Sequence, residues 1–153
     1  MKKYTLLILL LMVTGCASNK GVTTLDPVNL EKSTQIFILK DAATRESVLP
    51  VLEKWFQNNG YSATVIESLK EAQPDNYVLS YSARWGWDMA TYMRAVEMRV
   101  NSNGESLGHL NFDALQYGGF GKFGSAETRL NILLDALFGK ITLEQANQLL
   151  GDA

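Results

Sequence analysis

One histidine and a few carboxylates are the side chains best suited to acid–base chemistry in this sequence. His109 is the only histidine in the 153 residues. A Ser-His-Asp triad would have to pass through it, with Asp88 or Asp113 as partner, and no Gly-x-Ser-x-Gly nucleophile elbow accompanies them. A single histidine also excludes a zinc site of ordinary composition. We therefore expect no enzyme activity, no metal and no cofactor, and interpret His109 as a strand-surface residue and Asp88 as a turn residue.

Glycine-rich residues 118–124 carry two phenylalanines and a lysine between four glycines. A glycine-rich loop that runs into a helix can hold a phosphate, but that motif ends in Gly-Lys-Ser or Gly-Lys-Thr, and here Phe123 follows Lys122. An anion at the start of the next helix stays an alternative. We interpret the segment as a mobile loop whose Phe120 and Phe123 contact the core or a partner.

The first residues have the pattern of a secretory signal peptide. Lys2 and Lys3 supply positive charge, residues 6–13 are apolar, and small residues precede Cys16, the sole cysteine. The apolar run is too short to span a bilayer as a helix. We predict a signal peptide in residues 1–15.

The sequence Val13-Thr14-Gly15-Cys16 resembles the lipobox of bacterial lipoproteins. The resemblance implies that the Cys16 sulfur receives diacylglycerol and that the chain is cut just before it. A lone cysteine has no intramolecular disulfide partner, which agrees with a lipidated sulfur; the alternative is ordinary cleavage that leaves a free thiol. Two or more acyl chains anchor a protein stably. By the same resemblance, Ala17 favours the outer membrane, with the domain in the periplasm.

The charge of the chain excludes nucleic acid as a partner. The formal net charge is −2, and removing the two lysines of the signal peptide leaves 12 basic and 16 acidic side chains, a net charge of −4. Nucleic-acid binding would need a basic face, and electrostatic adhesion to anionic lipid would need the same. We expect the covalent lipid on Cys16 to attach the protein to the membrane.

Apolar periodicity predicts a single α+β domain in residues 35–153. We expect the polar residues 16–34 to form a flexible tether, interrupted by Asp26-Pro27; the alternative is that residues 27–30 pack on the domain as an edge segment. Alternating or β-branched runs indicate strands, and apolar stripes at helical spacing indicate helices. The expected elements are strands at residues 35–39, 61–66, 76–87, 91–101 and 105–114, and helices at residues 44–58, 125–138 and 142–150.

This order of elements predicts a two-layer α/β sandwich with a mainly antiparallel sheet of about five strands, two main helices and a short C-terminal helix. Asn103-Gly104 is typical of a type I′ hairpin turn. Ser47 and Ser125 are expected to cap helices, and Thr142 with Gln145 forms a capping box.

Aromatic side chains are concentrated in one predicted hairpin. Tyr81, Trp85 and Trp87 alternate onto one face of its first strand, and Tyr92 lies on its second strand. Such a face forms either an exposed platform for a sugar or a partner protein, or part of the core beneath the helices. We favour the core for Tyr81 and leave Trp87 open. The candidate partner-binding residues are Trp85, Trp87, Tyr92, Phe120 and Phe123.

Residues 81–88, which end in Trp-x-Trp-Asp and lead into Tyr92-Met93, resemble a group of small uncharacterised bacterial lipoproteins. The glycine-rich stretch before a helix that ends in Leu137-Phe138 is similar to theirs as well. This resemblance implies no activity. The topology is also similar to envelope lipoproteins that act as accessory subunits of larger machines. We predict a lipid-anchored, non-enzymatic interaction or accessory module with an envelope protein as its partner; the alternative is a binder of a small glycan or lipid through an aromatic groove.

Overall fold

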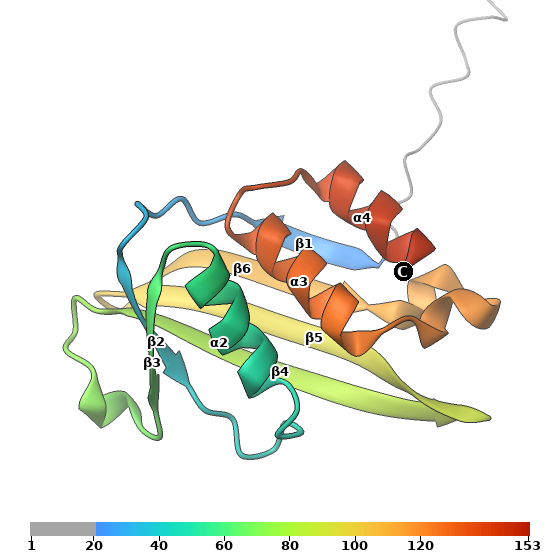
Figure 1. Ribbon diagram of the computed structural model, residues 1–153, viewed down its shortest axis with the longest axis horizontal. Coiled ribbons are helices and arrows are strands. Elements are labelled where there is room, and N and C mark those ends of the chain that lie inside the picture. The colour runs from blue at the N-terminus through green and yellow to red at the C-terminus, as the bar shows by residue number, and fades with distance from the viewer. Residues whose placement is uncertain (1–20) are drawn as a thin grey trace, which may run out of the picture.

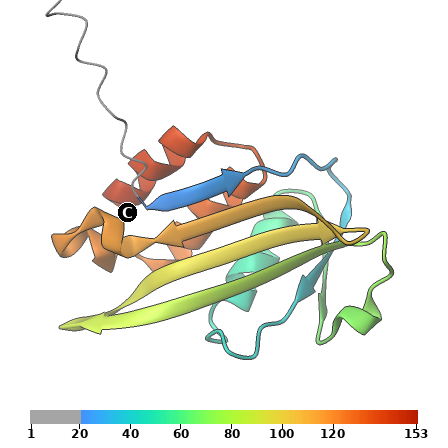
Figure 2. The same ribbon diagram turned by 180° about the vertical axis from the view of Figure 1, so that it is seen from behind.

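The structure, a computed structural model, describes residues 21–153. The predicted signal peptide and Cys16 lie outside the described residues. Within them, one open six-stranded sheet carries three α-helices on one face (Figure 1). Seen from behind, the other face of the sheet has no helix over it (Figure 2).

The sheet has the strand order β1-β6-β5-β4-β2-β3. Strand β2 is parallel to both of its neighbours, whereas the pairs β4–β5, β5–β6 and β6–β1 are antiparallel. The strands are β1 (Val22–Asp26), β2 (Gln35–Leu39), β3 (Ser62–Ile66), β4 (Tyr77–Asp88), β5 (Ala90–Ser102) and β6 (Glu105–Asp113). The helices are α2 (Leu49–Asn58), α3 (Ala126–Leu137) and α4 (Leu143–Asp152), with 3-10 helices η2 (Leu69–Glu71), η3 (Ala114–Tyr117) and η4 (Gly119–Phe123).

The α+β class is confirmed, but the prediction of a mainly antiparallel sheet of about five strands was wrong. The sheet is mixed because α2 carries the chain from β2 across to β3, and a helical crossover joins parallel strands. The sixth strand is β1, which lies in the segment that we expected to be a tether.

Residues 22–34 are therefore part of the domain rather than a tether. Val22 is fully buried in β1, and Val28 is 3% exposed and donates its backbone N–H to the carbonyl of Leu137 at 2.7 Å. Gly108 gives Val28 room, because a Cβ atom there would lie 2.9 Å from the Val28 Cβ. The alternative of a packed segment at residues 27–30 agrees with the position of Val28.

Two of the three α-helices begin at a residue whose side chain caps the helix. Ser125 Oγ accepts the backbone N–H of Thr128, and Thr142 and Gln145 form both bonds of a capping box, as predicted. The start of α2 was predicted too early, and Ser47 is not its cap: the helix begins at Leu49 behind Val48, which makes no side-chain capping bond.

The late start of α2 has a local cause. The Thr44 hydroxyl donates to Asp41 Oδ2 at 2.7 Å and accepts the backbone N–H of Ala83 in β4 at 2.9 Å. Residues 41–44 are thereby held as a turn against the sheet, and the helix starts only after it.

The core lies between the helices and one face of the sheet. Leu79, Tyr81 and Ala83 of β4 point into it, and Tyr81 is 7% exposed, which confirms its predicted place in the core. The outer face of β4 carries Ser80, Ser82 and Arg84. One predicted face of this strand is therefore buried along most of its length.

We predict that Val28→Ala lowers the free energy of unfolding by about 2 kcal/mol, because it removes two buried methyl groups and leaves a cavity beside Gly108. Urea unfolding monitored by circular dichroism measures the change. Lys32→Ala, at an exposed position of the same segment, is the matched control and should be neutral. Equal stability of Val28→Ala and wild type would mean that the segment is a tether after all.

Candidate functional site

Three large apolar side chains are exposed together at one end of the molecule. Trp87 is 76% exposed and Met89 is 89% exposed, both at the turn between β4 and β5, and Phe120 of η4 is 91% exposed. The turn and η4 lie at the same end of the sheet in both views (Figures 1 and 2). We call Trp87, Met89 and Phe120 the apolar tip.

η4 contacts the hairpin through residues that neighbour those of the apolar tip. The rings of Tyr92 and Phe123 meet edge to face with centroids 5.5 Å apart. Lys122 Nζ donates to Asp88 Oδ2 and lies 5.7 Å from the centre of the Tyr92 ring. The Tyr92 ring covers Gly86, where a Cβ atom would lie 2.7 Å from the ring. Only glycine fits under this ring.

A fully buried arginine of α3 is hydrogen-bonded to the backbone of η4. Arg129, in the first turn of α3, is 0% exposed, and its guanidinium donates to the carbonyls of Lys122, at 2.7 Å, and Gly121. Burial lowers the pKa of Arg129. The hydrogen bonds to charged guanidinium fix the backbone that carries Phe120 and Phe123.

The start of the described chain packs at this same end. The backbone carbonyl of Gly21 accepts the N–H of Asp113 at 2.8 Å, and a Cβ atom at Gly21 would overlap the Tyr117 ring. The Tyr117 hydroxyl lies 3.2 Å from the carbonyl of Asn147 in α4, and burial raises the pKa of Tyr117 to about 12. Gly21 is therefore next to η3. A single residue, Gly118, separates η3 from η4.

The structure separates the five candidate residues into exposed and supporting ones. Trp87 and Phe120 are exposed, whereas Tyr92 is 7% exposed and belongs to the core, and Phe123 packs on it. Trp85 is half-buried, with the Arg45 guanidinium 4.7 Å from the centre of its ring.

Sequence reasoning missed Met89 and misjudged the glycine-rich segment. Met89 links β4 to β5 with a φ of 62°, a conformation that favours glycine or asparagine, so nothing in its residue type marked it as a turn. The segment predicted as a mobile loop forms the 3-10 helix η4, which is hydrogen-bonded to Arg129, and its Phe123 packs against the core as predicted.

The residues of the hypothetical triad do not converge. His109 Nε2 lies 3.5 Å from Glu97 Oε1 and has no hydrogen-bond partner in the described part of the chain. Asp88 pairs with Lys122, and Asp113 Oδ1 accepts the backbone N–H of Leu115. Residues 21–153 also contain no cluster of three or more His, Cys, Asp or Glu side chains that could hold a metal ion.

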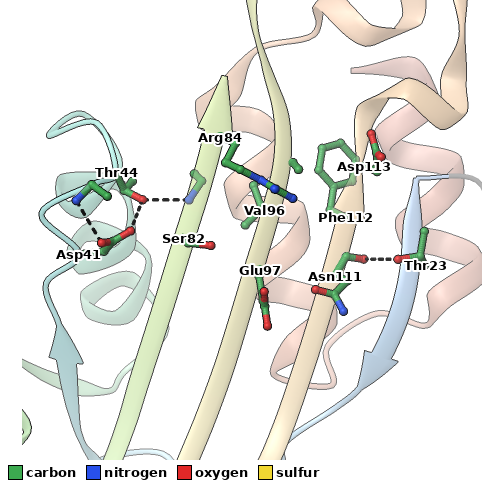
Figure 3. Close-up of a pocket in the computed structure, with 13 residues that line it drawn as sticks. Thr23, Asp41, Thr44, Ser82, Arg84, Val96, Glu97, Asn111, Phe112 and Asp113 are labelled. Atoms are coloured by element: carbon green, nitrogen blue, oxygen red, sulfur yellow. Dashed lines mark hydrogen bonds between the residues drawn. The ribbon is translucent and has the colours of Figure 1, made fainter. Parts of the chain in front are cut away.

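A shallow hollow of about 520 Å³ lies on the helix-free face of the sheet (Figure 3). Arg84 reaches across β5 there, with Glu97, Asn111 and Asp113 around it. Phe112 is its one aromatic lining residue. The lining of this hollow mixes polar and apolar side chains, and it is not the aromatic groove that the ligand-binding alternative requires.

Comparison with known proteins places the chain in no family. No protein-family model and no curated protein matches it. A solved structure similar to it is a PelC dodecamer from Paraburkholderia phytofirmans, with a TM-score of 0.44, 12% sequence identity, and coverage of 84% of this chain and 93% of that chain. A similarity this distant carries no argument about function. No helix among residues 21–153 is long and apolar enough to cross a membrane.

We predict that Arg129→Met loosens η4, because the carbonyls of Gly121 and Lys122 lose their charged donors. Amide hydrogen exchange in residues 114–124 should accelerate, and the free energy of unfolding should fall by about 1–3 kcal/mol. Hydrogen-exchange mass spectrometry and urea unfolding measure the two effects. Arg94→Met, at an exposed arginine, is the control. Unchanged exchange in residues 114–124 would show that Arg129 does not hold this segment.

We predict that Tyr117 makes the protein less stable in alkali. Its pKa is about 12 in the folded chain against an ordinary value of 10.0, so the unfolded chain loses this proton first. The stabilisation is complete below pH 10 and is lost as the pH rises toward 12. The free energy of unfolding of Tyr117→Phe should therefore fall by about 1 kcal/mol less than that of the wild type over this pH window. The difference is smaller than the full pKa shift would give, because solvent screens part of the effect. Urea unfolding across the window tests it, and parallel pH profiles for the two proteins would contradict it.

Proposed function

We propose that this protein is a lipid-anchored, non-enzymatic interaction module of the bacterial cell envelope that presents its apolar tip to another envelope component. The observation that carries the proposal is the exposure of Trp87, Met89 and Phe120 together at one end of the domain. Exposed apolar side chains that gather at one place are typical of interaction sites, whereas scattered ones are not.

The support beneath the apolar tip favours a binding role. Arg129 and the Lys122–Asp88 pair hold η4 against the hairpin, so little side-chain or loop ordering remains to oppose association. Tryptophan is also the residue type most enriched among side chains that dominate binding energy. A rigid support and an exposed aromatic side chain together form a preorganised contact.

The lipid anchor rests on the lipobox resemblance and on the position of the first described residue. Cys16 is the only cysteine, and it directly follows the apolar segment of the signal peptide. Gly21 lies beside η3, at the end that carries the apolar tip. A lipid on Cys16 would hold that end toward the membrane.

A second candidate function is the binding of a small polar ligand, such as a glycan, in the hollow on the helix-free face. Arg84, Glu97 and Asn111 offer donors and acceptors there. The mixed charge of the lining fits hydroxyl groups better than a lipid tail. This candidate differs from the aromatic groove expected from the sequence.

We predict that the wild-type chain incorporates a labelled fatty acid and is shortened to begin at Cys16, whereas Cys16→Ser does neither, because the lipid is attached through sulfur. Metabolic labelling in a bacterial host, followed by intact-mass measurement, tests both points. Trp87→Ala is the control and should be labelled and cut normally, since an exposed side chain of the folded domain takes no part in lipidation. A wild-type chain without lipid would refute the anchored module.

A further inference from the structure

We propose that the apolar tip inserts into the lipid bilayer interface, as a second membrane contact beside the lipid on Cys16. This inference rests on the proposed function, because the anchor brings the tip to the membrane. It identifies the envelope component that meets Trp87, Met89 and Phe120 as phospholipid rather than protein.

The length of chain between the anchor and the domain keeps the tip close to the bilayer. Five peptide links join Cys16 to Gly21, and they span at most roughly 18 Å in any conformation. Gly21 packs on Tyr117, and Gly118 alone separates Tyr117 from η4. The lipid on Cys16 would therefore keep η3 and the start of η4 within reach of the membrane surface, and the β4–β5 turn lies at the same end of the sheet (Figure 1).

The shape and composition of the tip fit a lipid interface. Trp87, Met89 and Phe120 are each at least three-quarters exposed and come from two separate segments, so they project rather than line a groove. A fluid interface adapts to projecting side chains, whereas a protein partner would need a matching pocket for each. Tryptophan is enriched where the hydrocarbon meets the headgroups, because its ring is apolar and its N–H is polar.

The charges near the tip agree with lipid headgroups. Asp88 is the acidic residue beside Trp87, and Lys122 neutralises it. Arg94 of β5 is exposed and forms no ion pair with any residue in the described part of the chain, whereas Arg84 reaches into the hollow on the helix-free face. Arginine binds phosphate well. The net charge of the chain disfavours adhesion of the whole domain to anionic lipid, but Arg94 offers an exposed cation on the hairpin that carries Trp87 and Met89.

The fluorescence of Trp87 tests the insertion directly. The native lipidated protein is reconstituted into vesicles of phosphatidylethanolamine and phosphatidylglycerol, with or without bromine on the acyl chains, which quenches nearby tryptophan. Trp55 is 4% exposed in the core and Trp85 is half-buried, so the difference between wild type and Trp87→Phe reports Trp87. We expect the Trp87 emission to shift to the blue on reconstitution and to be quenched by the brominated lipid.

A matched control places a tryptophan at the other end of the sheet. Leu69 of η2 is 61% exposed and lies near the turn at Asn103 and Gly104, far from the β4–β5 turn (Figure 1). Leu69→Trp in the Trp87→Phe background should stay in water and escape quenching. The double variant Met89→Ser, Phe120→Ser keeps Trp87 and should reduce its quenching, because two of the three inserted side chains are lost.

The possible outcomes separate this inference from the proposed function. A protein that is anchored to the vesicles but shows no quenching of Trp87, or equal quenching at position 69, overturns insertion and leaves the anchored module standing. A protein that does not remain with the vesicles refutes the anchored module, and the insertion with it. Quenching at position 87 alone supports both.

Discussion

The hydrogen bonds of the buried Arg129 guanidinium are the interaction on which the end of the molecule with the apolar tip depends. A charged group without solvent needs hydrogen-bond partners, and here the carbonyls of Lys122 and Gly121 accept from the two terminal nitrogens of Arg129, while its Nε has no partner among residues 21–153. These bonds set the backbone of η4. The position of η4 in turn allows Lys122 to reach Asp88 and Phe123 to pack on Tyr92. One buried cation thus orders side chains from three elements.

The same end of the domain also receives the start of the described chain. β1 closes one edge of the sheet, and Asn147 of α4 accepts the backbone N–H of Val22 at 2.8 Å. The beginning of β1, η3 and α4 therefore form one packed unit around Tyr117. A pull on a membrane anchor would be transmitted to the sheet and to α4 rather than to a single loop. The helices cover the opposite face from the hollow that Arg84 and Glu97 line, and that hollow stays accessible in this arrangement.

Local patterns predicted much of the fold because local physics determines those features. Asn103 and Gly104 both have positive φ, as the type I′ turn requires. The capping residues Ser125 and Thr142 mark the starts of α3 and α4 because their side chains satisfy backbone N–H groups within the same turn. β1 escaped prediction because its alternation is weak: a bulge follows Val22, and most of its side chains are polar.

The sequence by itself determined the strands of the central hairpin, the starts of α3 and α4, and the presence of aromatic residues at the hairpin end. Only the tertiary structure decided which of those aromatic residues are exposed. Tyr92 is buried because η4, about 30 residues later in the chain, folds onto it, whereas Trp87 is 76% exposed although its neighbour Asp88 pairs with Lys122 of η4. Periodicity assigns a side chain to a face of its strand. Periodicity does not predict the long-range contacts, such as those of Arg129 with η4, that determine which segment covers that face.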